Sequence, residues 1–375
     1  METSLENKNS KVITLLKMKI GIVTFQCSHN YGAVLQTYGL QEFLLSKGYD
    51  VYIINYNPKY KTRQYSKYSC RHWLSRNPYK CITRFINEIG ILKIRVNRWN
   101  AFNSFRTNRF RLYPYSKSSD FSEFDYIVLG SDQIWNPGLT GGKFDGIFWG
   151  ENMNCKVLSY AASTRKYTYT EEEKDYIKKH LEKLSAISVR EDRIKNILQS
   201  FIEKQITVVL DPSLLAGVDI YRKISQKPKL NNYVLIYEIG RNKGTRKLAE
   251  RIARQKNLKI IELVNSPIKQ DSSLNQIASP EEFLGYIEFA SYVVTTSFHG
   301  VAFSYLFKRN FYALRQNTSA DERLSSFLSS VRLIDRFIDM NKNIEVNDID
   351  YEITKDIFNA EYKKSSDYLL KALSI

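Results

Sequence analysis

Short apolar runs alternate with amphipathic runs along most of the chain, a pattern typical of α/β proteins with parallel sheets. The first unit has an apolar run over Lys19–Phe25, helical apolar spacing over Val34–Leu45 and a second apolar run over Tyr49–Tyr56. This order predicts a strand, a helix and a strand joined as a βαβ unit with a right-handed crossover. Further strands are predicted over Phe124–Leu129, Lys156–Ala161, Ala186–Val189 and Thr207–Leu210.

A second series of the same kind begins after a polar segment at Arg222–Asn232. We therefore expect two Rossmann-like domains that face a cleft, at residues 18–220 and 232–345. The remaining residues, 346–375, are predicted to form a C-terminal helix that packs back on the first domain. The elements predicted in this half are strands at Tyr233–Glu238, Lys259–Val264, Tyr292–Thr296, Phe311–Leu314 and Asn343–Val346, and helices at Thr245–Gln255, Glu281–Phe289, Asp321–Val331 and Ile353–Leu373.

Residues 58–116 interrupt the first domain as a basic, aromatic-rich insertion. Residues 59–117 contain 15 Lys or Arg and a single acid, Glu88, within a chain whose formal net charge is +17. Two helices are predicted there, over Ile82–Val96 and Trp99–Phe110. Such a surface suits peripheral contact with an anionic membrane, and an ordinary solvated pair of helices explains it equally well. A nucleic-acid-binding protein would also explain the charge, but not polar residues at strand ends in both domains, so we expect no nucleic-acid partner.

The composition places few further limits on the protein. Its 375 residues can bury two domain cores, and its four cysteines show no CxxC spacing, so we expect reduced thiols and no zinc site. The N-terminal residues lack the order of a signal peptide, and no apolar run approaches the ~20 residues of a membrane-spanning helix. We expect a cytoplasmic protein, with peripheral contact at the inner face of the membrane if the insertion binds lipid.

Polar side chains follow the apolar runs in both predicted domains. Ligands of parallel sheets bind outside the carboxyl ends of the strands, where helix N-termini offer N–H groups to anions. Burying polar groups there costs free energy unless something satisfies them, so their repetition predicts a cleft between two sheets. Singly, each has a structural explanation, such as a turn at Asp211-Pro212. The residues concerned are His29, Asn30, Asp132, Ser163, Arg165, Arg190 and Asp211 in the first domain and His299 and Arg315 in the second.

His299 is the strongest candidate for proton transfer. The sharp break Ser297-Phe298-His299-Gly300 separates a predicted strand from a predicted helix, which places the imidazole at the carboxyl end of that strand. Histidine titrates near neutral pH and can exchange a proton with a bound reactant. A histidine that is merely satisfied in a turn is the alternative interpretation.

The chain resembles the polysaccharide pyruvyl transferase family. The matching stretches, in the order of the family, are IGIVTFQCSHNYGAVLQTYGLQEFLLSKG, YIVLGSDQIWNP, LSYAAS, ISVRED, VVLDPSLL and YVVTTSFHGVAFSYLF. The resemblance implies a glycosyltransferase-B-like architecture of two Rossmann-like domains. It also implies transfer of a pyruvyl group from phosphoenolpyruvate to a sugar diol of a capsule or exopolysaccharide, or of its lipid-linked precursor, as a cyclic ketal. His299 matches the histidine of the family, and Arg190 matches the arginine of its S-x-R-[DE] motif. Ser297 stands where many members have arginine.

The expected site follows from the donor's chemistry. Phosphoenolpyruvate carries a carboxylate and a phosphate, so cations and helix N-termini are needed more than a metal, and we expect no cofactor. We expect Arg190 and Arg165 to hold the donor, with N–H groups near Gly300, and Arg315 or Arg165 to replace the missing arginine. His299 would be the acid, and Asp132 or His29 the base. Ser163, Asn30 and Ser297 complete the expected binding residues. The alternative is a glycosyltransferase of the same architecture that uses a nucleotide sugar.

Overall fold

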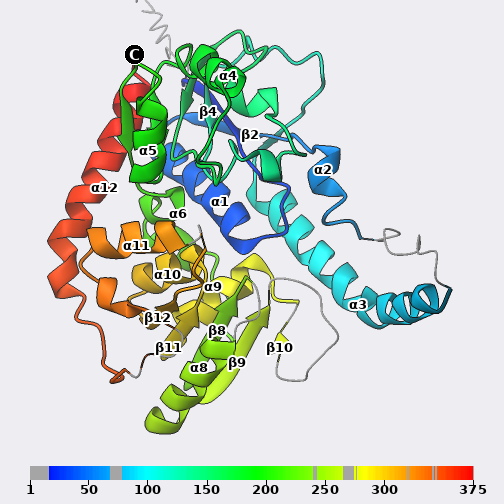
Figure 1. Ribbon diagram of the computed structural model, residues 1–375, viewed down its shortest axis with the longest axis vertical. Helices are drawn as coiled ribbons and strands as arrows, with labels where there is room; N and C mark the ends of the chain where they lie inside the picture. Colours follow the sequence, from blue (N-terminus) through cyan, green and yellow to red (C-terminus); the bar gives the residue numbers. More distant parts are fainter. Residues whose placement is uncertain are drawn as a thin grey trace, which may run out of the picture.

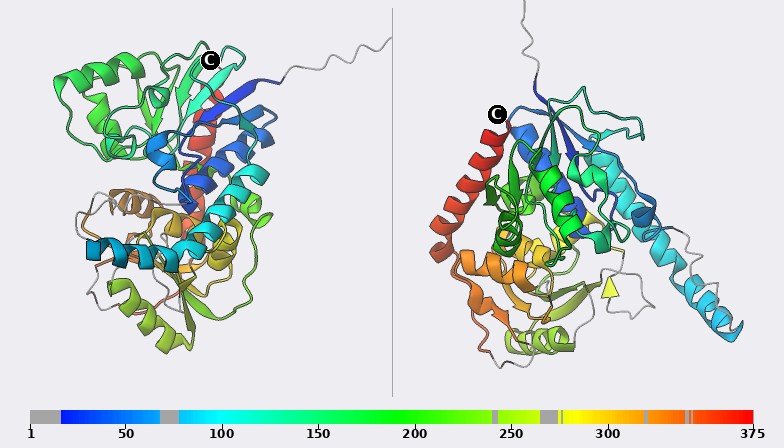
Figure 2. Two further views of the ribbon diagram at one scale, coloured as in Figure 1. Left: turned by 90° about the vertical axis from the view of Figure 1, so that its right-hand side faces the viewer. Right: turned by 45° about the horizontal axis from the view of Figure 1, so that its top comes forward.

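The computed structural model describes residues 17–67, 78–239, 243–264, 274–275, 277–318, 321–339, 342 and 344–374. Figure 1 shows two α/β bodies stacked along the long axis of the molecule, and the turned views of Figure 2 show the same division. Each body is built on its own parallel sheet.

The first body has a five-stranded sheet in the order β3-β2-β1-β4-β5, which a pair of strands, β6 and β7, continues through single bridges at Ala162. Strand β1 is central, and its apolar sequence suits burial on both faces. The strands are β1 (Lys19–Val23), β2 (Asp50–Ile54), β3 (Leu112–Tyr113), β4 (Tyr126–Leu129), β5 (Lys156–Ser159), β6 (Ile187–Val189) and β7 (Ile206–Val208). The helices are α1 (Tyr31–Ser46), α2 (Lys59–Thr62), α3 (Pro78–Arg109), α4 (Glu171–Leu181), α5 (Asp192–Gln199), α6 (Pro212–Leu215) and α7 (Val218–Arg222), with short 3₁₀ turns at Pro137–Leu139 and Gly146–Trp149.

The second body has six parallel strands in the order β10-β9-β8-β11-β12-β13. Its central strand β8 is buried at every position, as expected of a strand covered on both faces. The strands are β8 (Tyr233–Glu238), β9 (Lys259–Val264), β10 (Leu274–Asn275), β11 (Tyr292–Thr295), β12 (Asn310–Leu314) and β13 (Phe337–Ile338). The helices are α8 (Lys243–Lys256), α9 (Pro280–Glu288), α10 (Phe298–Leu306), α11 (Asp321–Ser330) and the C-terminal α12 (Glu352–Ala372), with a 3₁₀ turn at Ile334–Arg336.

Both sheets share one topology, in which the first strand of the series lies between the second and the fourth. The strand order therefore reverses at β1/β4 in the first sheet and at β8/β11 in the second. Ligands of doubly wound sheets bind outside the carboxyl ends of the strands at this reversal. The topology confirms the predicted fold class, two Rossmann-like domains in a glycosyltransferase-B-like arrangement.

Helix α1 lies where the two bodies meet and is buried on nearly every side. Asn30 caps it by accepting a hydrogen bond from the Ala33 backbone N–H at 3.2 Å. At its first turn, the Tyr31 hydroxyl donates to the Ala278 carbonyl of the second body at 2.8 Å, and the Tyr31 ring stacks on Phe283. A helix that is apolar on all sides must be covered on all sides, so α1 joins the two domains.

The C-terminal helix α12 contacts both bodies and runs along their common side (Figure 1). Near its start, the hydroxyl groups of Thr354 and of Tyr305 in α10 lie 2.9 Å apart. Near its end, the hydroxyl of Ser365 accepts a hydrogen bond from the Leu210 N–H of the first body at 2.9 Å. The helix therefore acts as a strap across the domain boundary.

The basic insertion differs from its prediction in one respect. A single helix, α3, spans the segment in which two helices were expected. At the position of the expected break, the helix continues and Arg98 points inward, where its guanidinium donates to the Tyr31 hydroxyl at 3.0 Å and to the His29 carbonyl at 3.2 Å. Figure 2 shows that the first half of α3 extends away from the first body. Of the helices in the described ranges, none is long and apolar enough to cross a membrane.

Two short strands also differ from the sequence prediction. The insertion rejoins the first sheet through β3, which pairs in parallel with β2 and was not predicted. The strand expected over Asn343–Val346 was wrong as far as the described residues 344–346 are concerned, since the last strand of the second sheet is β13. Two-residue edge strands carry too little pattern to be recognised from sequence.

Ser365→Ala tests the strap. The substitution leaves the buried Leu210 N–H without an acceptor, so we expect the free energy of unfolding to fall by about 1–3 kcal/mol. Urea denaturation provides the measurement, and Asp367→Ala, at an exposed position of the same helix, should change it by less than about 0.5 kcal/mol. Equal stability of the two variants would show that α12 is not held by this contact.

Candidate functional site

His299 lies in the first turn of α10, directly after the carboxyl end of β11. Its ring packs against Gly32 in the first turn of α1, so that a Cβ added at Gly32 would lie 2.0 Å from the His299 Nδ1. The two helix starts thus approach each other across the domain boundary. Only the absence of a side chain at Gly32 leaves room for the imidazole.

Asp211 connects this histidine to the first domain. Its Oδ2 accepts a hydrogen bond from the Arg190 Nη1 at 2.6 Å, and its Oδ1 lies 3.8 Å from the His299 Nε2. The backbone N–H and hydroxyl of Ser213 also donate to Asp211, at 2.9 and 2.7 Å, because Asp211 caps α6. The side chains of Arg190, Asp211 and His299 are all buried. The predicted approach of Arg190 and His299 therefore occurs through one carboxylate.

Arg190 is surrounded by three carboxylates. Besides Asp211, its Nε donates to the Glu191 Oε1 at 3.3 Å, and its Nη2 lies 3.8 Å from the Asp132 Oδ1. Burial alone would lower the pKa of Arg190, but these neighbouring negative charges outweigh it and raise the pKa. For Asp211, burial acts in the opposite direction and raises the pKa. The charges of Arg190 and His299 and the hydrogen bonds from Ser213 outweigh burial and lower the pKa of Asp211 to about 2. Arg190 and Asp211 are therefore a fixed ion pair at neutral pH.

His299 has a different protonation state. Burial lowers its pKa to about 4; Asp211 opposes this effect, and the positive charge of Arg190 adds to it. The imidazole is therefore neutral at pH 7 in the free protein. A negative charge brought close to it would favour its protonation.

Several buried polar atoms around this cluster have no hydrogen-bond partner among the described residues. Buried polar atoms are rarely left unpaired, and such a group of them points to a bound ligand or solvent. The Ser297 hydroxyl is one of these, although the Tyr237 hydroxyl is near enough to interact with it. The atoms are Arg190 Nη2, Glu191 Oε2, Thr296 Oγ1, Ser297 Oγ and His299 Nε2.

A cavity of about 240 Å³ adjoins the cluster and lies between the domains. Arg190 and Asp211 line it from the first domain, Phe298 and Arg323 from the second. The rest of its polar wall is formed by Asp192 of α5, by Ser326 and Ser330, one and two turns along α11 from Arg323, and by Glu361 and Lys364 of α12. The cavity has room for a small anion and has guanidinium groups on two sides.

The structure brings several other predicted residues to this site. The Ser163 hydroxyl donates to the Glu191 Oε1 at 3.0 Å, and Asp132 lies beside Arg190 in a left-handed backbone conformation, with φ of 79°. Gly300 lies against the end of β11, because a Cβ added at Gly300 would come within 2.3 Å of the Thr295 hydroxyl. Arg165 is exposed, and its charge contributes to lowering the pKa of Arg323.

Two predicted residues lie among other partners. His29 stacks between Tyr65 and Phe102, with ring centroids 5.1 and 5.3 Å away, and burial lowers its pKa to about 3. Arg315 packs on the Phe337 ring and lies 3.5 Å from the Asp339 carboxylate. Neither has a contact with Arg190, Asp211 or His299 within the described parts of the chain. These geometries favour Asp132 over His29 as a base and leave Arg315 without a role in the cluster.

Sequence reasoning assigned no role to three residues of the site. Asp211 was noted at a strand end, but its sequence context, Asp-Pro, also fits the helix cap that it forms. Glu191 follows Arg190 directly in the sequence, where a local ion pair is the simplest interpretation. Arg323 lies in the polar sequence DERLSSFLSS, in which nothing distinguishes it from a solvated arginine. In the described residues, no group of three or more His, Cys, Asp or Glu side chains is arranged to hold a metal ion.

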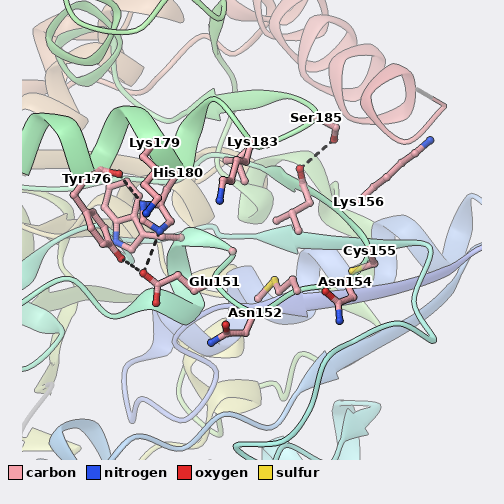
Figure 3. Close-up of a pocket in the computed structure, with 15 residues that line it drawn as sticks. Glu151, Asn152, Asn154, Cys155, Lys156, Tyr176, Lys179, His180, Lys183 and Ser185 are labelled. Carbon is pink, nitrogen blue, oxygen red and sulfur yellow. Dashed lines mark hydrogen bonds and ion pairs between the residues drawn. The ribbon is translucent and has the colours of Figure 1, made fainter.

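A larger hollow, of about 860 Å³, lies on the first domain beside α4 (Figure 3). Figure 3 shows His180 and Tyr176 directed at Glu151, with which they form contacts of 3.1 and 2.8 Å. The lysines that line it are exposed, and its lining includes none of the predicted site residues. Since His180, Tyr176 and Glu151 satisfy one another, we place the functional site at the domain boundary instead.

Comparison with known proteins identifies the family of the chain. Residues 30–318 match the family described as polysaccharide pyruvyl transferase, a range that contains Asp211, Arg190 and His299. The chain belongs to the polysaccharide pyruvyl transferase family. It is accordingly a transferase of polysaccharide biosynthesis. A search of curated proteins finds no match.

Solved structures resemble the chain only distantly. A UDP-GlcNAc 2-epimerase from Methanocaldococcus jannaschii aligns with 13% identity and a TM-score of 0.47 over 96% of this chain and 99% of its own. A putative UDP-N-acetylglucosamine 2-epimerase from Listeria monocytogenes aligns with 11% identity and a TM-score of 0.45 over 95% and 91%. The glycosyltransferase SnogD from Streptomyces nogalater aligns with 9% identity and a TM-score of 0.35 over 96% and 95%. At these scores the likeness carries no conclusion about substrate.

Gly32→Ala tests the contact between the helix starts. Alanine normally stabilises a helix relative to glycine by roughly 0.5–1 kcal/mol, but here its Cβ would displace the His299 ring. We expect transferase activity to fall at least about tenfold, as misplaced catalytic groups do. Gly90→Ala is the matched control, because Gly90 is also helical and its Cβ would meet open space. Activity that is equally retained in both variants would rule out a catalytic contact at Gly32.

Proposed function

We propose that the protein transfers the pyruvyl group of phosphoenolpyruvate to two hydroxyl groups of one sugar, forming a cyclic pyruvate ketal. The single observation that carries this proposal is the buried set of His299, Asp211 and Arg190 beside a cavity lined by two arginines. Membership of the family supports the reaction class. The acceptor is proposed to be a surface polysaccharide or its lipid-linked precursor.

The donor would bind by its two anionic groups. Arginine binds carboxylate and phosphate with paired, charge-assisted hydrogen bonds, and the buried Arg190 Nη2 makes no hydrogen bond among the described residues. The N–H groups of the first turn of α10 add a partial positive charge for phosphate oxygens. The Ser163 hydroxyl does not donate to the donor's phosphate in this arrangement, since it already donates a hydrogen bond to Glu191.

His299 would then act as the acid. The donor's phosphate brings negative charge to a neutral imidazole and raises its pKa, so that His299 takes up a proton as the donor binds. It gives this proton to the methylene carbon, which becomes the methyl group and leaves C2 electron-deficient. One sugar hydroxyl adds to C2, phosphate leaves, and the second hydroxyl closes the ring. The two hydroxyl protons go to the base and to the released phosphate.

Asp132 is the base that the geometry favours. Its carboxylate lies at the end of β4, at the reversal of the first sheet, and its Oδ1 accepts only the Gln133 N–H at 2.8 Å among hydrogen bonds from the described residues. The same Oδ1 lies 3.8 Å from the Arg190 Nη2, which places the carboxylate beside the proposed donor-binding guanidinium. The aromatic stacking of His29 gives it no comparable freedom.

His299→Gln tests the acid role and the donor together. Loss of a general acid lowers turnover by roughly 10²–10⁴-fold, and we expect a loss of this size in phosphate release from phosphoenolpyruvate with a sugar acceptor. Asp367→Ala, at an exposed position of α12, is the control. A variant with nearly normal turnover would refute the assigned role of His299.

Thermal shift of the wild-type protein distinguishes the donor. We expect phosphoenolpyruvate to raise the melting temperature and a UDP-sugar to leave it unchanged, because a ligand stabilises only the state that it binds. The opposite result would favour the nucleotide-sugar glycosyltransferase.

A further inference from the structure

Arg323 lines the same cavity as Arg190, but from the second domain. It lies on α11, and its side chain is 11% exposed. Burial lowers its pKa to about 10, and the neighbouring charge of Arg190 adds to this effect. Two guanidinium groups held close together in a buried place repel each other unless an anion lies between them.

Three carboxylates face Arg190, but among the described residues only Glu191 lies within 4.0 Å of the Arg323 guanidinium. The Arg323 Nε lies 4.0 Å from the Glu191 Oε1, which is too far for a hydrogen bond. That oxygen already accepts from the Ser163 hydroxyl and from the Arg190 Nε. Burial also raises the pKa of Glu191. Within the described parts of the chain, the Arg323 guanidinium makes no hydrogen bond.

The position of Arg323 is fixed by the surrounding packing. The Asp321 carboxylate accepts hydrogen bonds from the Gln316 and Asn317 N–H groups at the start of α11. Phe327, one turn after Arg323, packs edge-on against Phe298 and Tyr305 of α10. Helix α11 therefore holds Arg323 in register with the helix that carries His299.

We propose that Arg323 is the second arm of a donor clamp, which binds anionic oxygen atoms of phosphoenolpyruvate opposite Arg190. The donor is then held between the two domains, one arginine from each. This proposal rests on the proposed function and adds the residue that secures the donor in the second domain, where Ser297 offers only a hydroxyl group.

The test compares Arg323→Met and Arg323→Lys with Glu322→Gln, all in the full-length protein. Glu322 is next to Arg323 and also pairs across the domain boundary, with Arg193, but outside the cavity. A charge-assisted hydrogen bond lost from the donor should raise the KM for phosphoenolpyruvate roughly 10- to 100-fold in Arg323→Met. The KM for the sugar should change less than about threefold, and Arg323→Lys should restore the donor KM only in part, because lysine lacks the planar fork. Glu322→Gln should match wild type.

A purely structural role for Arg323 would give a different result. It would lower the urea midpoint of Arg323→Met and raise the KM values of both substrates together, and that outcome would overturn the proposal. A donor KM unchanged in Arg323→Met would overturn it as well.

Inorganic phosphate separates this proposal from the proposed function. We expect phosphate to raise the melting temperature of wild type and of Glu322→Gln but not of Arg323→Met. If wild type responds to phosphate through Arg323 but never uses phosphoenolpyruvate, the donor assignment fails and the anion clamp stands. If phosphate stabilises Arg323→Met as well as wild type, the clamp fails.

Discussion

The buried carboxylate of Asp211 is the interaction on which the rest of the site depends. It holds the Arg190 guanidinium at 2.6 Å and lies 3.8 Å from the His299 imidazole, and so joins a strand end of the first domain to a helix start of the second. Burying charged groups costs several kcal/mol per ion, which a single ion pair repays only with good geometry and further hydrogen bonds. Ser213 supplies two such bonds. The network is therefore poor evidence of stability and better evidence of a site that must hold charge in fixed places.

The contacts at the domain boundary also hold groups of the site in fixed places. Gly32 leaves the space that the His299 ring fills, Tyr31 reaches the Ala278 carbonyl, and α12 is tied to both bodies through Thr354 and Ser365. Each contact fixes the distance between the two sheets. A site divided between two domains needs that distance to be set, because the proposed acid, His299, belongs to one domain and Arg190 to the other.

Much of this arrangement could be predicted from the sequence, because a buried parallel strand and the polar residues after it make a strong local pattern. The β11–turn–α10 segment, with His299 at its break, was predicted in this way and is present. Arg323 could not be predicted, since its role comes from the packing of α11 against α10 and not from its neighbours in the chain. The single helix α3 was missed for a similar reason: Arg98 is buried by contacts with residues 67 and 69 positions away.

The most direct test of the account is an NMR titration of the His299 imidazole with and without saturating phosphoenolpyruvate, assigned by comparison with His299→Gln. The account predicts a pKa near 4 in the free protein, because burial disfavours the cation. It predicts a rise of more than about one unit with the donor bound, because the phosphate favours the cation. A pKa near its ordinary value in the free protein, or one that the donor leaves unchanged, would contradict it.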